Sequence, residues 1–144
     1  MLMQIALVVA QRGTCDRAQV GAVITRDGRI ISVGYNGAPP GLPHCEENNH
    51  GWYDAPHHDD HNLGCRNATH AEANALCFAA QYGISTDEAE LFVTVAPCDT
   101  CSRLLIAAGI AAVVYLDEYR NSKGIQTMSS AGIVVAKFEV SEPA

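Results

Sequence analysis

The stretch LFVTVAPCDTCSRLLIAAGIAAVVYL, residues 91–116, contains the pattern that decides the fold. Residues 91–95 and 110–116 are apolar and contain several β-branched side chains, which favours strands. Between them, residues 98–108 have a helical pattern that ends at Gly109. A strand, a helix and a second strand in this order predict a right-handed crossover between two parallel strands.

Neighbouring segments extend this unit in both directions along the chain. The Asp27-Gly28 pair between the strand-like runs 20–25 and 29–34 predicts an antiparallel hairpin. The other predicted elements are helices at residues 2–11, 69–82 and 122–131 and a strand at residues 133–140. Together they predict an α/β fold, a three-layer α/β/α domain with a mixed five-stranded sheet whose last three strands are parallel. Residues 1–144 are expected to form a single domain, in which residues 35–68 are a long loop of the kind that usually serves a function.

Three potential zinc ligands and one additional carboxylate occur in two short motifs. A His-Ala-Glu sequence runs from His70 to Glu72, and a Pro-Cys-Asp-Thr-Cys sequence runs from Pro97 to Cys101. Zinc prefers imidazole nitrogen and thiolate sulfur, and a catalytic site with three protein ligands keeps a fourth position for water. His70, Cys98 and Cys101 are therefore the candidate ligands. Glu72 is not needed as a ligand, so it is the candidate catalytic proton shuttle.

The spacing within the motifs supports this assignment. Cys98 and Cys101 are three residues apart, so their sulfurs share one face of a helix. Thr69 is expected to cap the helix at 69–82, with His70 and Glu72 in its first turn and their side chains projecting in different directions. A lone Cys-x-x-Cys sequence is also typical of a closed zinc site or a redox pair. The additional His-x-Glu motif disfavours the redox pair.

Composition limits the partners of the chain. Acidic residues outnumber basic ones, 16 to 9, so the 144-residue chain has a net charge of −7 with neutral histidine. Affinity for a phosphate backbone comes from clustered lysine and arginine, so nucleic acid is not expected as a partner, whereas a small phosphorylated substrate stays compatible. No apolar run approaches the roughly 20 residues of a membrane span, so no membrane partner is expected. Six cysteines without a secretory leader favour a reduced, cytoplasmic setting (the host cytoplasm for a phage-encoded protein).

Segments beyond the zinc motifs share one resemblance. They are Thr14-Cys15, Val20-Gly21-Ala22-Val23-Ile24, Gly34-Tyr35-Asn36-Gly37 and His70-Ala71-Glu72-Ala73-Asn74-Ala75. His-x-Glu with Pro-Cys-x-x-Cys is itself the known pattern of zinc-dependent nucleobase deaminases. Over nearly its whole length the chain resembles the deoxycytidylate (dCMP) deaminases of the cytidine and deoxycytidylate deaminase superfamily.

The resemblance implies a reaction and a regulated assembly. The reaction is hydrolytic deamination of dCMP to dUMP and ammonia, which supplies dUMP for thymidylate synthesis. It implies zinc on His70, Cys98 and Cys101, with Glu72 moving the protons. It also implies a hydrogen bond from Asn36 to the deoxyribose. Family members are commonly hexameric, with dCTP as activator and dTTP as inhibitor, so a homohexamer with these effectors is expected.

Two residues after the predicted strand at 110–116 are candidates for substrate contact. Tyr119 and Arg120 lie where a ligand crevice opens beside a parallel sheet. The tyrosine ring suits a cover over the base, and the guanidinium suits a bidentate contact with phosphate. With Asn36 and Ala71 they are the candidate substrate-binding residues. The alternative for Tyr119 and Arg120 is an exposed turn.

Four further cysteine and histidine residues predict a second, structural zinc site. They are Cys15, Cys45, His61 and Cys65. His61 and Cys65 are four residues apart, a same-face pair on a helix, and four such ligands form a closed site. Some phage and bacterial members of the family carry a second zinc on residues from similar places. Other loop histidines compete as ligands, mainly His57 as a partner of His61, and the alternative is free cysteines with solvent-facing histidines.

The helices at 69–82 and 98–108 are rich in alanine and leucine, more than the core of one small domain obviously needs. Small side chains allow helices to approach closely, and excess apolar surface marks subunit interfaces, so a homo-oligomer is expected. The domain core is the alternative explanation for these alanines. Tyr119 and Arg120 are expected to switch between effector-bound states, and Cys77 is expected to be a small core residue.

Three other functions fit parts of the pattern. A deaminase acting on a cytosine or adenine base in nucleic acid needs a basic groove and stacking aromatics, which the acidic balance opposes. A non-catalytic zinc-binding assembly protein needs no proton shuttle such as Glu72. A deaminase of free cytidine or deoxycytidine shares the chemistry, but the long loop at residues 35–68 and the segment Gly34-Tyr35-Asn36-Gly37 favour the dCMP branch.

Overall fold

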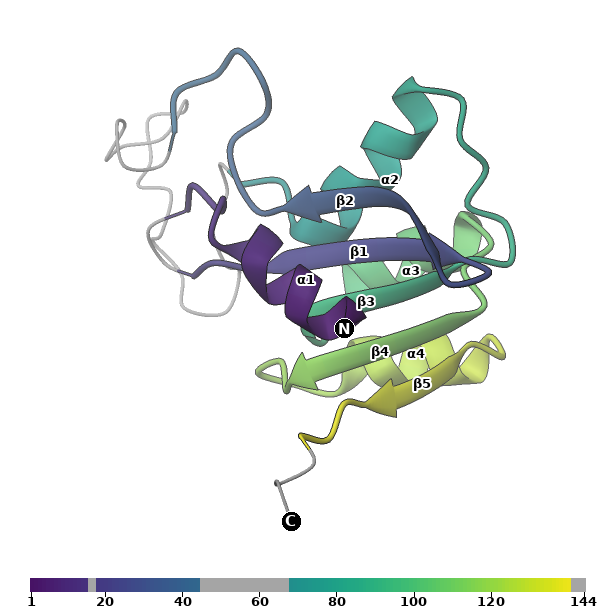
Figure 1. The fold of residues 1–144 in the computed structure, drawn as a ribbon. Helices are drawn as coiled ribbons and strands as arrows, with labels where there is room; N and C mark the ends of the chain where they lie inside the picture. Colours follow the sequence, from purple (N-terminus) through teal and green to yellow (C-terminus); the bar gives the residue numbers. More distant parts are fainter. Residues whose placement is uncertain (16–17, 45–67, 141–144) are drawn as a thin grey trace.

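The computed structural model describes residues 1–15, 18–44 and 68–140. Along these residues the elements follow the predicted order (Figure 1). They are α1 (Leu2–Ala10), β1 (Gly21–Arg26), β2 (Arg29–Tyr35), α2 (Ala71–Gln81), β3 (Glu90–Val95), α3 (Asp99–Ala107), β4 (Ala112–Asp117), α4 (Lys123–Ser130) and β5 (Val134–Lys137).

The five strands form one mixed sheet in the order β2-β1-β3-β4-β5. β1 pairs antiparallel with both β2 and β3, and β3, β4 and β5 are parallel. At the β1–β2 turn, Asp27 and Gly28 have positive φ angles of 52° and 75°, as a type I′ hairpin requires. The predicted mixed sheet, with its antiparallel hairpin and its parallel second half, is confirmed.

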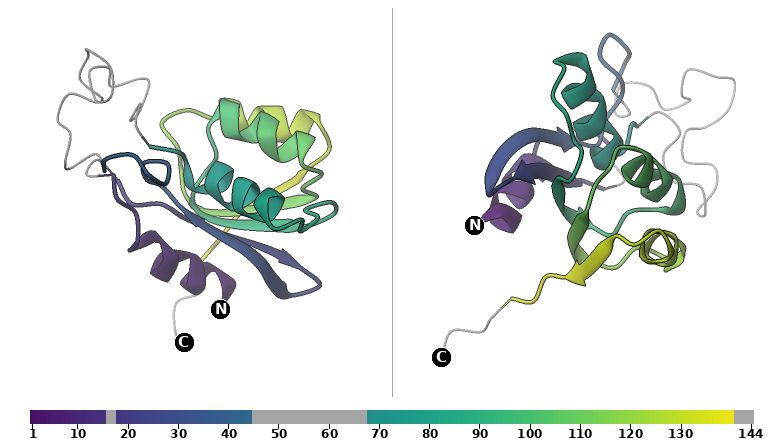
Figure 2. Two further views of the ribbon diagram at one scale, coloured as in Figure 1. Left: turned by 90° about the horizontal axis from the view of Figure 1, so that it is seen from above. Right: turned by 90° about the vertical axis from the view of Figure 1, so that its right-hand side faces the viewer.

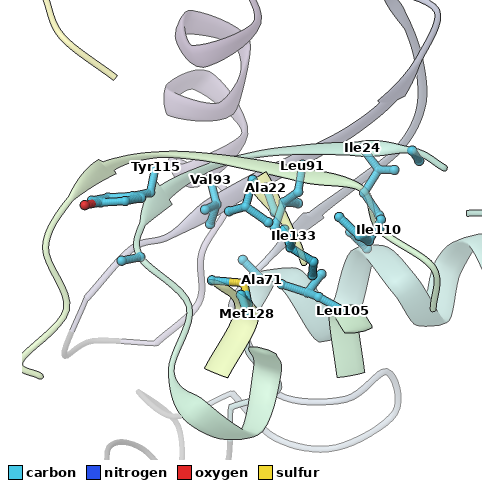
Figure 3. Close-up of a cluster of buried hydrophobic side chains, with 14 residues drawn as sticks. Ala22, Ile24, Ala71, Leu91, Val93, Leu105, Ile110, Tyr115, Met128 and Ile133 are labelled. Atoms are coloured by element: carbon cyan, nitrogen blue, oxygen red, sulfur yellow. The ribbon is translucent and has the colours of Figure 1, made fainter. Parts of the chain in front are cut away.

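The sheet is covered on both faces, which confirms the three layers (Figure 2). Successive side chains of a strand point to opposite faces. In β1, Val23 packs with Met3 and Ala6 of α1 on one face, whereas Ala22 and Ile24 belong to the core on the other face. That second core lies between the sheet and α2, α3 and α4. Its members labelled in Figure 3 include Ala71, Leu91, Val93, Leu105, Tyr115 and Met128.

Several boundaries differ from the prediction because of contacts between distant segments. The prediction that Thr69 caps the second helix is wrong, since α2 begins at Ala71 with His70 as its N-cap. Thr69 instead exchanges backbone hydrogen bonds with Gly37, at 2.7 and 3.1 Å. The strand predicted at residues 133–140 is shorter and ends at Lys137.

The prediction that Cys77 belongs to the core is also wrong, because its side chain is exposed. The buried face of α2 is formed by Ala71, Ala75 and Ala79, which recur every four residues. Cys77 is two residues away from Ala75 and Ala79, so it lies on the other side of the helix. None of the helices in the described parts of the chain has the length and apolar character needed to cross a membrane.

Candidate active site

His70, Cys98 and Cys101 meet at the start of two helices. His70 has an extended backbone (φ −65°, ψ 153°) directly before α2, and Cys98 has an extended backbone (φ −70°, ψ 171°) directly before α3. The Nδ1 atom of His70 lies 3.6 Å from Cys98 Sγ and 3.4 Å from Cys101 Sγ. All three potential ligand atoms lie within 4.8 Å of one another. The structure thus brings together the three ligands that the motifs predict.

The protonation of the three side chains matches a site for a cation. Hydrogen bonding with Cys101 lowers the pKa of Cys98 to about 4, while the same hydrogen bond and burial raise the pKa of Cys101. The hydrogen bond with Cys98 raises the pKa of His70. The lowered pKa favours the thiolate form of Cys98, and the raised pKa values favour protonated Cys101 and His70. A metal ion that binds these side chains displaces such protons. One nitrogen and two sulfurs at this spacing fit zinc with three protein ligands.

Glu72 lies beside this cluster in the first turn of α2 and is almost completely buried, with 4% of its surface exposed. Burial raises its pKa to about 6, because a charged carboxylate loses its hydration there. The nearby His70 charge acts in the opposite direction. A carboxylate in this position is suited both to accept and to donate a proton.

Hydrogen bonds to β2 hold α2 so that His70 and Glu72 face the cysteines. The Asn74 side chain donates from Nδ2 to the Tyr35 carbonyl oxygen at 2.7 Å. The buried hydroxyl of Ser32 donates to the Ala75 carbonyl oxygen at 2.7 Å. Sequence reasoning used Asn74 only as part of a motif and did not identify Ser32. An Asn two residues after the Glu of His-x-Glu is the one local signal that points to such a support.

A cavity of about 160 Å³ opens next to the cluster at the carboxyl end of β3. Val95 and Ala96 line its floor, which is where ligands bind beside parallel strands. The candidate residues on its wall are Cys15, Asn36, His70, Ala71, Glu72, Cys98, Tyr119 and Arg120. Glu72 and every predicted substrate-binding residue therefore line one cavity, while Cys101 is buried with its Sγ 3.4 Å from His70 Nδ1.

Asn36 is buried and holds the segment that forms one wall of this cavity. Its Oδ1 accepts a hydrogen bond from the Val20 backbone N–H at 2.7 Å, and its Nδ2 donates to the Ala18 carbonyl oxygen at 2.6 Å. An amide nitrogen has two hydrogens, so one of them is left for a ligand. Asn36 can thus support the wall and contact a substrate at the same time.

Tyr119 and Arg120, in the segment after β4, also line the cavity. The guanidinium carbon of Arg120 is 5.1 Å from the centroid of the Tyr119 ring, a cation–π arrangement. Tyr119 also packs against the core under α2, α3 and α4. Both residues thus line the cavity, while Arg120 is also exposed; their contact with substrate stays a prediction.

The predicted second zinc site lies mostly outside the described residues. Cys15 is described and is buried at the cavity wall, but Cys45, His61 and Cys65 are not described. His57, the main competing ligand, is not described either. Among the described residues, the group with metal-ligand geometry is His70, Cys98 and Cys101. The second site stays a prediction.

Comparisons with known proteins agree on one family. A family model described as the cytidine and deoxycytidylate deaminase zinc-binding region matches residues 1–117. The ComE operon protein 2 of Bacillus subtilis (strain 168) is 38% identical over 136 residues, which cover 94% of this chain and 68% of that protein. The deoxycytidylate deaminase of Enterobacteria phage T4 is 34% identical and matches 85% of this chain and 79% of its own length. The crystal structure of the dCMP deaminase from cyanophage S-TIM5 in complex with dCMP and dUMP has a TM-score of 0.79 and 32% identity, covering 94% of this chain and 93% of that one.

Proposed function

The chain belongs to the cytidine and deoxycytidylate deaminase family, and from this premise we propose that it deaminates dCMP hydrolytically to dUMP and ammonia. The observation that carries the proposal is the buried Glu72 beside the His70, Cys98 and Cys101 cluster in a single cavity. Relatives that are 34% and 32% identical are deoxycytidylate deaminases, and the structure of one of them contains dCMP and dUMP. Residues 1–144 act as one deaminase domain, and the dUMP formed supplies thymidylate synthesis.

The side chains of the cavity divide the chemistry between them. His70, Cys98 and Cys101 hold zinc, which when bound supplies Lewis-acid activation of a water molecule. Glu72 takes a proton from the water that adds to C4 of the cytosine base. It delivers this proton to N3, then takes the remaining proton from the new hydroxyl group on C4 and delivers it to the departing amino group, so water and dCMP become dUMP and ammonia. The nearly complete burial of Glu72 keeps bulk water from competing for these protons.

The remaining cavity residues are assigned to substrate binding. Asn36 hydrogen-bonds the deoxyribose through its remaining amide hydrogen, and Ala71 lies against the base between His70 and Glu72. Tyr119 covers the base, and Arg120 contacts the phosphate; both residues line the cavity. The acidic balance of the chain, 16 acidic against 9 basic residues, favours a single nucleotide over a nucleic-acid strand.

An apolar surface on α2 and α3 supports a homo-oligomer, with a hexamer expected from the family resemblance. Phe78, Tyr82 and Leu104 are 45%, 64% and 44% exposed, and the rings of Phe78 and Tyr82 are 4.8 Å apart. A groove between the two helices is lined mainly by small apolar side chains, among them Ala73 and Ala107. Ala75 and Ala79, in contrast, belong to the core of the domain and have no bearing on assembly. In such an oligomer, dCTP as activator and dTTP as inhibitor act on a shared quaternary state, with Tyr119 and Arg120 as the residues that switch.

Two further assignments complete the proposal. The first is a second, structural zinc ion on Cys15, Cys45, His61 and Cys65, supported by the buried position of Cys15. The second is a cytoplasmic location, supported by the need for reduced thiolates at Cys98 and Cys101.

A substrate panel tests the proposed function. Purified protein is assayed for ammonia release from dCMP, CMP, deoxycytidine, cytidine and an RNA stem-loop, with and without dCTP and dTTP. We expect turnover of dCMP at a kcat/KM well above that of the other compounds. Turnover of the nucleosides or the RNA with none of dCMP would contradict the assignment.

A further inference from the structure

The turn that carries Cys98 and Cys101 is held from behind by α4. Gly124 lies in the first turn of α4 and is buried against this turn. A Cβ atom at Gly124 would lie 2.1 Å from the Pro97 carbonyl oxygen and 2.6 Å from Ser102 Oγ. It would also lie 2.9 Å from the carbonyl carbon of Cys98. These distances are too short for any side chain, so glycine is needed for α4 to approach the cysteine turn this closely.

Ser102 holds the same turn from inside α3. It is fully buried, and its hydroxyl donates to the Cys98 carbonyl oxygen at 2.8 Å. The backbone N–H of Ser102 donates to the same oxygen at 2.9 Å. Two hydrogen bonds to one carbonyl oxygen fix the peptide plane that follows Cys98. Because Cys98 Sγ in turn accepts a hydrogen bond from the Cys101 N–H at 3.4 Å, the orientation of this plane affects both sulfurs.

A third contact joins the same turn to α4. Asp99, between the two cysteines, accepts a hydrogen bond on Oδ1 from the Thr127 hydroxyl at 2.7 Å. Its other oxygen accepts from Arg103 at 3.2 Å. Gly124 and Thr127 are three residues apart in α4 and therefore face the turn together.

We propose that Gly124 and Ser102 are positioning residues, which set the distance and direction of the Cys98 and Cys101 sulfurs relative to His70. The inference rests on the proposed function, since it concerns the zinc site of that reaction. Sulfur-to-nitrogen distances of 3.6 and 3.4 Å leave little room for displacement of the turn. Loss of a group that orients a metal ligand typically costs about 10–100-fold in metal affinity.

The test compares two variants of the turn with two matched controls. The variants are Gly124→Ala and Ser102→Ala. The control for the first is Gly21→Ala, because a Cβ atom at Gly21 would lie 2.0 Å from the Ala6 carbonyl oxygen, an equal overlap with α1 on the opposite face of the sheet. The control for the second is Ser129→Ala, which removes an exposed hydroxyl from α4.

Three measurements are made on each variant of the 144-residue chain: thermal unfolding, competition for zinc by a chromogenic chelator, and the visible absorption spectrum after substitution with Co²⁺. Cys101→Ser removes one of the three candidate ligands. The change it causes in zinc release and in the Co²⁺ spectrum identifies the signal of this site, should the chain bind a second ion elsewhere. Gly124→Ala and Ser102→Ala should lose zinc about 10–100-fold more readily and show altered Co²⁺ bands. Gly21→Ala should unfold at a lower temperature but keep the zinc affinity and the Co²⁺ spectrum of the unaltered protein. Ser129→Ala should match the unaltered protein in all three measurements.

The proposal can be tested even if one of the two turn variants does not fold. If Gly124→Ala does not fold, folded Ser102→Ala decides the question alone. Unaltered zinc retention and an unaltered Co²⁺ spectrum in Ser102→Ala would overturn the proposal. Both readouts are independent of the nucleotide that is deaminated, so failure of the unaltered protein to deaminate dCMP would refute the proposed function and leave this inference standing.

Discussion

Replacement of Glu72 by glutamine should remove most dCMP turnover while the zinc stays bound. Glutamine has nearly the same volume as glutamate, so the buried position in α2 stays filled. The amide cannot take a proton from water or deliver one to the leaving amine, because it has no ionisable oxygen. The ligand cluster of His70, Cys98 and Cys101 is unchanged by the substitution.

The expected size of the loss follows from the role of the carboxylate. A positioned general acid–base group typically contributes about 10²–10⁴-fold to the rate. At 1.36 kcal/mol for each factor of ten, this corresponds to about 3–5 kcal/mol of the activation barrier. Glu72 serves the attacking water and the leaving amine in turn, and its burial excludes solvent as a substitute, so we expect a loss in the upper half of this range.

The assay is steady-state ammonia release from dCMP, together with zinc content by atomic absorption. The matched control is Glu90→Gln, because Glu90 is exposed at the end of β3 opposite to the cavity. The control should retain both activity and zinc. A Glu72→Gln protein with normal zinc content and a kcat within about tenfold of the unaltered enzyme would refute the role assigned to Glu72.

Three further predictions concern the second zinc, assembly and the core. Native protein should contain two zinc ions per chain and Cys45→Ser one; a ratio of one in both proteins would contradict the second site. Phe78→Glu should shift the oligomer toward smaller species in light scattering, whereas Val8→Glu, at an exposed residue of α1, should not; an oligomer indifferent to both would contradict the α2–α3 interface. Leu105→Ala should cost about 2–5 kcal/mol of unfolding free energy in denaturant titration, because Leu105 is fully buried in the core. The same substitution at Leu7, which is 43% exposed, should cost clearly less, and equal costs would contradict the assigned core.

The layered fold could be predicted because local patterns carry its signals. The positive φ angles of Asp27 and Gly28 follow from residue types that tolerate them, and the hairpin follows from that turn. The crossover from β3 through α3 to β4 follows from alternating strand and helix patterns in residues 91–116. Predictions at the ends of elements were less accurate. Thr69 is drawn into backbone pairing with Gly37, a partner 32 positions earlier that no local pattern indicates.

The candidate site likewise contains residues that could be predicted from the sequence and residues that could not. His70, Glu72, Cys98 and Cys101 could be predicted because metal chemistry demands particular side chains at particular short spacings. Their supports could not be predicted, since a serine or a glycine has no distinctive chemistry in a sequence. The roles of Ser32, Ser102 and Gly124 appear only when their partners are in place.

The sequence by itself thus determined the order of the elements, the pairing of the hairpin and the identity of the ligands, because each depends on residues close together in the chain. The tertiary structure alone decided how His70 meets Cys98 from a position 28 residues away, at 3.6 Å. It also decided that Cys77 is exposed while Ala75 and Ala79 are buried. The physical reason is that these outcomes depend on packing distances between α2, α3, α4 and the sheet, to which residues from the whole chain contribute.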